Sequence, residues 1–131
     1  MSAEAAKKRA TLADALYAAP DTKTSLRLIL GMGLQSYDVS PALGVDSQEV
    51  LAWVVGVQES CEEHEMAIGS LKAITMFFLK RGELSTSGLA AWLAEPNVGL
   101  KARTPLQVLP TEGGIDAILN VGATFVTPEP I

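Results

Sequence analysis

The chain has 131 residues, 48% of them hydrophobic and 19% charged, which predicts one ordinary globular domain and excludes disorder over the whole length. Fifteen acidic against ten basic residues give a net charge of −5, which argues against a general affinity for nucleic acid or anionic membranes. The single cysteine excludes disulfides within the chain and zinc sites made of cysteines alone.

The first thirty residues predict two helices separated by a proline. The first helix covers 3–18, where leucines are spaced along one face, and it ends at Pro20 and Asp21. Thr22 is expected to cap the second helix, which ends at the glycine-containing stretch 31–33. No feature of this region indicates a function.

A helical corner is predicted next. A short helix over 36–43 is ended by Gly44, and Asp46 with Glu49 forms the pattern of a capping box. The apolar stretch VLAWVVG that follows is compatible with a buried strand by composition alone. Because a cap precedes it, we predict a helix that ends at Gly56.

The second half predicts a long helix and three shorter ones. The longest runs over 60–80, with acids in its first turns and bases in its last, as the helix dipole favours. Thr104 before Pro105 predicts a short capped turn. The other expected elements are a helix from Ser85 or Ser87 to Pro96, a last helix from Thr111 through Ile115, Ile118, Leu119 and Phe125, and an extended tail, Val126 to Ile131. The fold class is therefore all-α, with about seven or eight short helices.

Candidate catalytic and metal-binding residues are few. Cys61 and His64 share one helix face, as in a nucleophile pair or half of a metal site. A metal needs three or four ligands and the chain has no second cysteine or histidine, and the neighbouring glutamates disfavour a thiolate. Neither the Gly31-x-Gly33 pattern nor Gly113-Gly114 completes a nucleotide- or phosphate-binding loop. We expect no enzyme, no metal site and no cofactor.

The region 36–56 has the pattern of a helix-turn-helix unit. Gly44 supplies the tight turn, although any two-helix corner with a core tryptophan has the same pattern. In a DNA-binding unit, Ser47 and Gln48 would face the bases. No lysine or arginine lies between Arg27 and Lys72, whereas seven acids do, and these oppose phosphate contacts. The apolar residues at the expected offsets are Leu43, Val45, Val50 and Trp53.

The most distinctive stretch is Trp92-Leu93-x-x-Pro96-Asn97-x-x-Leu100-x-x-Arg103-Thr104-Pro105-Leu106-x-x-Leu109. It resembles the C-terminal toxin-binding domain of the Xre/MbcA/ParS antitoxin family over about 79–125. The helix-turn-helix-like region, which is degenerate, and the long helix also stand in the family's order. The resemblance divides the chain into an N-terminal helical region, 1–59, with the helix-turn-helix-like unit at about 36–56, and a part, 60–131, with the long helix, the toxin-binding-like domain and the tail.

The resemblance implies a cytoplasmic antitoxin that forms a homodimer and binds a RES-type toxin in a hetero-oligomer. The toxin would be an enzyme that destroys NAD, and the antitoxin would cover its active site. An acidic protein suits a cleft that accepts a pyrophosphate, and the tail carboxylate of Ile131 suits an anion site, unless the tail is a frayed end. The toxin-binding residues would be Trp92, Pro96, Asn97, Leu100, Arg103, Thr104, Pro105 and Ile131.

Two other functions stay open at this point. Many family members bind their own promoter, so an Xre-type transcriptional regulator is the alternative function, which the acids around Ser47 and Gln48 disfavour. An adaptor that has lost both partners is a third. No membrane partner is expected, because the longest aliphatic run, 50–57, is far too short to span a bilayer and no secretory signal is visible.

Overall fold

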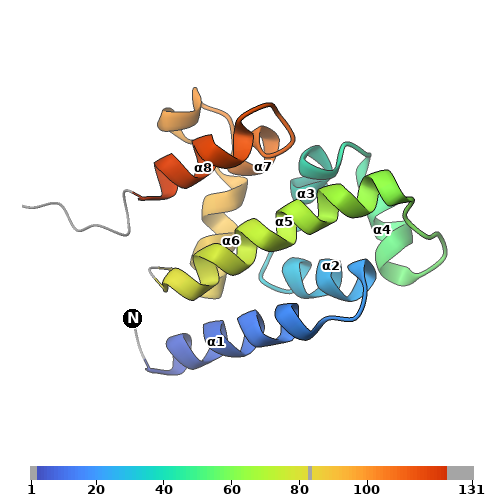
Figure 1. The fold of residues 1–131 in the computed structure, drawn as a ribbon, viewed down its shortest axis with the longest axis horizontal. Coiled ribbons are helices and arrows are strands. Elements are labelled where there is room, and N and C mark those ends of the chain that lie inside the picture. The colour runs from blue at the N-terminus through green and yellow to red at the C-terminus, as the bar shows by residue number, and fades with distance from the viewer. Residues whose placement is uncertain (1–2, 83, 124–131) are drawn as a thin grey trace, which may run out of the picture.

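A computed structural model describes residues 3–82 and 84–123, and in these ranges the chain forms helices joined by short connections, with no strand (Figure 1). The expectation of an all-α fold with seven or eight short helices is confirmed. The elements are α1 (Ala3–Ala18), α2 (Thr22–Leu30), α3 (Ser36–Leu43), α4 (Ser47–Val55), α5 (Glu62–Arg81), α6 (Thr86–Ala94), the 3-10 turn η1 (Val98–Leu100), α7 (Pro105–Val108) and α8 (Gly114–Gly122).

The long helix α5 is the centre of the molecule. It packs against α1, α2, α3 and α6, and Figure 1 shows α1 and α2 along one side of it, with α7 and α8 on the other. The short helix α3 contacts both α4 and α7. The helix-turn-helix-like corner and the C-terminal helices are therefore joined through α3 as well as through α5.

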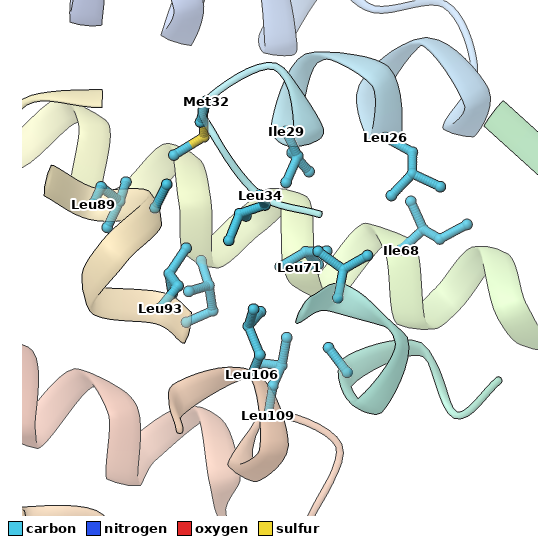
Figure 2. Packing of buried hydrophobic residues seen from close by; sticks show 14 of the residues in the cluster. Leu26, Ile29, Met32, Leu34, Ile68, Leu71, Leu89, Leu93, Leu106 and Leu109 are labelled. Carbon is cyan, nitrogen blue, oxygen red and sulfur yellow. The ribbon is translucent and has the colours of Figure 1, made fainter. Parts of the chain in front are cut away.

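One hydrophobic core connects these helices. Ile68 and Leu71 of α5 meet Leu26 of α2, and Leu93 and Leu106 close the core from α6 and α7 (Figure 2). The apolar residues of α5 recur at helical spacing, so one face of this helix is buried along most of its length. The core draws side chains from both 1–59 and 60–131.

Most helix starts follow the expected caps. Asp46 accepts a hydrogen bond from the Glu49 amide at 2.8 Å, and Ser85, not Ser87, accepts one from Gly88 at 3.0 Å. The corner after Gly44 is helical as predicted, and the strand interpretation of VLAWVVG is excluded. Gly44 has φ 72°, a left-handed conformation that glycine adopts without strain.

The predicted cap of α2 is wrong by one residue. Asp21 is the cap: its Oδ1 accepts a hydrogen bond from the Thr24 amide at 2.7 Å, while Thr22 is the first helical residue. The hydrogen bond from Thr24 holds the pKa of the Asp21 carboxyl below its usual value. Aspartate is at least as good a cap as threonine, so the sequence contained the correct signal one position earlier.

The predicted start of the last helix is also wrong. Thr111 lies before α8, where its hydroxyl donates a hydrogen bond to the Val108 carbonyl at 2.6 Å. The helix begins only after Gly113, which has φ 70°. Ile115, expected to face the core, is 42% exposed. Phe125 and the tail 126–131 lie outside the described residues.

Candidate functional site

The connection from α6 to α7, hereafter the 97–103 loop, is held closed by hydrogen bonds of Asn97, its first residue. The Asn97 amide donates to the Arg103 carbonyl at 3.0 Å, and the Ala102 amide donates to the Asn97 carbonyl at 2.9 Å. The Asn97 side-chain oxygen accepts a third hydrogen bond, from the Gly99 amide, at 2.8 Å. Asn97 therefore joins both ends of the loop and fixes its first turn.

Two consecutive residues of this loop have a left-handed backbone although neither is glycine. Lys101 has φ 59° and Ala102 has φ 64°, a conformation that costs an L-residue about 1–2 kcal/mol. Such residues persist only where the surroundings determine them, and they concentrate at functional sites. Here the surroundings include the Lys101 amide bonded to the Val98 carbonyl at 3.1 Å and the Arg103 Nε bonded to the Leu100 carbonyl at 3.2 Å.

The loop is anchored in the hydrophobic core and also packs against α8. Leu100 is 2% exposed and belongs to the hydrophobic core. Gly99 packs so closely on α8 that a Cβ atom there would lie 2.9 Å from Val121 Cγ2, and α8 contacts η1. The loop is therefore a rigid part of the surface, held by α8 as well as by its own hydrogen bonds.

The loop presents an apolar side chain to solvent. Val98 is 95% exposed, and Lys101 and Arg103 are exposed beside it in the same loop. Val98 is not among the binding residues that the sequence motif predicts. The available signal was a branched apolar residue directly after Pro-Asn, in a turn where polar residues and glycine are usual. An exposed valine on a rigid loop is a suitable anchor for a protein partner.

The predicted site residues divide into those on the surface and those that build it. Pro96 and Arg103 are exposed, and Asn97 is half-buried. Leu100 and Pro105 are buried, so their side chains position the loop and α7 and are shielded from a partner. The roles of these residues in toxin binding stay predictions, and Ile131 lies outside the described residues.

Two further predicted residues flank the loop. Trp92 is half-buried, with its ring centroid 5.2 Å from that of Phe78 in an edge-on contact. Thr104 caps α7 in a reciprocal capping box with Gln107, at 3.0 Å and 2.9 Å. Trp92 thus packs α6, which precedes the loop, against α5, and Thr104 stabilises the start of α7, which follows it.

The other candidates do not form a comparable site. Cys61 Sγ lies 3.2 Å from His64 Nδ1 on the exposed start of α5, and no group of three or more potential metal ligands occurs among residues 3–82 and 84–123. On α4, Gln48 is exposed but Ser47 is only partly so. Within the same ranges no helix combines the length and hydropathy that crossing a bilayer requires.

Residues 85–121 match the family model of the antitoxin Xre/MbcA/ParS C-terminal toxin-binding domain. The match begins at the cap of α6 and ends within α8, so it includes the 97–103 loop and α7. The resemblance seen in the Trp92 to Leu109 motif is thereby confirmed. No curated protein and no solved structure matches the chain.

Proposed function

With an antitoxin toxin-binding domain at residues 85–121 as the premise, we propose that this protein neutralises a RES-type, NAD-degrading toxin by binding it and covering its active site. The observation that supports a binding surface within this domain is the hydrogen-bonded 97–103 loop, which exposes Val98 to solvent. The protein acts by binding the toxin and blocking its active site, and it performs no reaction of its own. It works in the cytoplasm, where NAD is consumed.

The rigidity of the loop favours tight binding. A loop that is already ordered in the free protein loses little conformational entropy when a partner docks. Seven hydrogen bonds within residues 97–103 and the buried Leu100 hold this loop in place. Val98 is the apolar anchor, and hydrogen bonds from Arg103 and contacts of Pro96 complete the rim around it.

The charge of the whole protein favours its approach to the toxin. A cleft that accepts NAD must attract a pyrophosphate and is therefore positive, while this chain carries a net charge of −5. Complementary charge accelerates association more than it strengthens the final complex. The apolar contact of Val98 then determines how long the complex lasts, and the antitoxin joins the toxin as a homodimer in a hetero-oligomer.

Co-expression with a RES-type toxin tests the proposal. The wild-type chain should restore growth and cellular NAD, and Val98→Asp should abolish this protection. Tyr37→Asp is the matched control, because Tyr37 is also an exposed apolar residue but lies on α3, outside the matched domain. A toxin that stays fully active beside the wild-type protein contradicts the proposed function.

A further inference from the structure

A pocket of about 300 Å³ lies where α2 and α5 begin and α4 ends. In Figure 1 the start of α2, the helix α4 and the α4–α5 loop come together at one end of the molecule. The wall of the pocket includes Leu26 and Ile68, which Figure 2 labels, and the indole of Trp53. All its lining residues lie within 21–68, outside the matched domain 85–121, so its occupant is independent of the proposed toxin.

Trp53 brings an unpaired hydrogen-bond donor to this pocket. Its side chain is 3% exposed, and its Nε1 is the one buried side-chain nitrogen or oxygen that lacks a hydrogen-bond partner within residues 3–82 and 84–123. The ring of His64, with its centroid 5.0 Å from that of Trp53, accepts no hydrogen bond from it. Buried donors without an acceptor destabilise a folded protein and are rare. This donor therefore points to an acceptor that comes from outside the chain.

The rim of the pocket is mostly acidic. It carries the carboxylates of Asp21, Glu59 and Glu65 and the single ammonium of Lys23. The Lys23 Nζ lies over the end of α4, because it is 3.3 Å from the position that a Cβ of Gly56 would occupy. The pocket thus combines two kinds of donor for an anionic group with a surplus of carboxylates for cationic groups.

We propose that this pocket binds an α-amino acid with a cationic side chain. The ligand carboxylate accepts a hydrogen bond from Trp53 Nε1 and faces the ammonium of Lys23. The α-ammonium and the side-chain cation of the ligand face Glu59 and Glu65, and its methylene groups lie on the apolar wall. Hydrogen bonds to charged groups are stronger than those between neutral groups, so a zwitterion with a second cation uses every feature of the site.

The size of the pocket and the mobility of its rim agree with such a ligand. A volume of about 300 Å³ is at the lower end for small-molecule sites, which favours an amino acid over a nucleotide. The carboxylates of the rim also repel phosphate groups. Trp53 Nε1 is covered in the free protein, but exposed rim side chains such as Gln58 and Glu65 change rotamer within nanoseconds. A ligand oxygen can therefore reach the indole nitrogen.

The indole N–H signals in a ¹H–¹⁵N correlation spectrum test the site directly. The chain has two tryptophans, and the signal that Trp53→Phe removes belongs to Trp53. Titration with L-arginine hydrochloride up to about 20 mM, at constant ionic strength, should shift the Trp53 indole proton downfield and reach saturation. The Trp92 indole signal is the internal reference and should stay in place.

Two analogues of arginine separate the parts of the ligand. Agmatine lacks the carboxylate, so it should leave the Trp53 indole proton unshifted. L-leucine keeps the carboxylate and the α-ammonium but lacks the side-chain cation, so it should bind at least about tenfold more weakly than arginine. Both measurements use the wild-type protein and depend on no variant.

Two variants test the residues, with arginine binding measured by isothermal titration. Trp53→Phe keeps an aromatic ring without the N–H, and Glu59→Gln/Glu65→Gln removes rim charge at exposed positions. Each should weaken arginine binding at least about tenfold. Glu95→Gln/Glu112→Gln is the matched control, because it changes the net charge equally at exposed positions outside the pocket, and it should bind arginine as the wild type does. Circular dichroism establishes that each variant is folded.

Several results overturn the proposal. One is a Trp53 indole signal that arginine leaves unchanged, as expected if bound water already satisfies the donor. Equal shifts of both indole signals, or an equal shift with agmatine, also contradict it. So does arginine binding that survives the loss of Glu59 and Glu65. None of these results bears on toxin binding, which growth rescue measures separately.

Discussion

Two short connections, the 97–103 loop and the Gly44 corner between α3 and α4, show two ways to join helices in this protein. The corner turns on one left-handed glycine with open space around it, which costs little. The loop turns on Lys101 and Ala102, which are left-handed without being glycine. A low-cost connection needs no functional explanation, whereas a strained and exposed one must be maintained by its surroundings. This difference supports the proposal that the 97–103 loop binds the partner.

Both connections depend on one core, and breaking it should affect both. Leu106 is fully buried in α7, and α7 packs on α3. Leu106→Ala should reduce the free energy of unfolding by about 2–5 kcal/mol, measured by urea denaturation. Amide exchange should accelerate in α3 as well as in the loop.

Leu51→Ala on α4 is the control for this substitution. Leu51 is an exposed residue, so the free energy of unfolding should change by less than about 0.5 kcal/mol. Faster exchange confined to the loop in Leu106→Ala would contradict a shared core, since α3 would then be supported without α7.

The two N-caps sharpen the comparison. Thr104→Ala and Asp46→Ala should each reduce the free energy of unfolding by about 1 kcal/mol. Thr104 follows the loop directly and Asp46 follows the corner, so only Thr104→Ala should weaken toxin binding. Thermal unfolding and a toxin titration on the same samples measure both effects, and equal losses of toxin affinity would contradict the assignment to the loop.

Glycine substitution tests the backbone strain through the sign of its effect. Ala102→Gly should stabilise the protein by up to about 1 kcal/mol, because glycine removes the steric cost of the left-handed conformation. Ala91→Gly, in the exposed middle of α6, should destabilise it by about 1 kcal/mol. Thermal unfolding compares the two variants, and destabilisation of similar size in both would show that Ala102 is unstrained.

Local signals in the sequence predicted the helices well. Ser85 and the pair Thr104-Pro105 are caps that depend only on neighbouring residues, and the structure contains them as expected. Thr22 and Thr111 were misassigned because another residue nearby, Asp21 or Gly113, fits the start of the helix better. Cap residue types predict that a helix starts within a few positions, and the backbone geometry determines which residue begins it.

The candidate site was less predictable than the fold. The motif includes Asn97 and Leu100, which lie in one hydrogen-bonded loop, but it did not show that Leu100 is buried. Nothing local marks Lys101 and Ala102 as left-handed, because neither is a residue type that favours that conformation. The loop that carries Val98 is held in part by Gly99 packing against Val121 of α8, more than twenty residues later in the chain. Tertiary contacts of this kind are not contained in a short pattern.

The affinity of the purified protein for its toxin tests the central claim most directly. Isothermal titration should show that Val98→Asp weakens binding at least about tenfold, which corresponds to about 1.4 kcal/mol, while its melting temperature equals that of the wild type. Tyr37→Asp should bind as the wild type does. An unchanged affinity of Val98→Asp would contradict the account, since the 97–103 loop would then be only a connection between two helices.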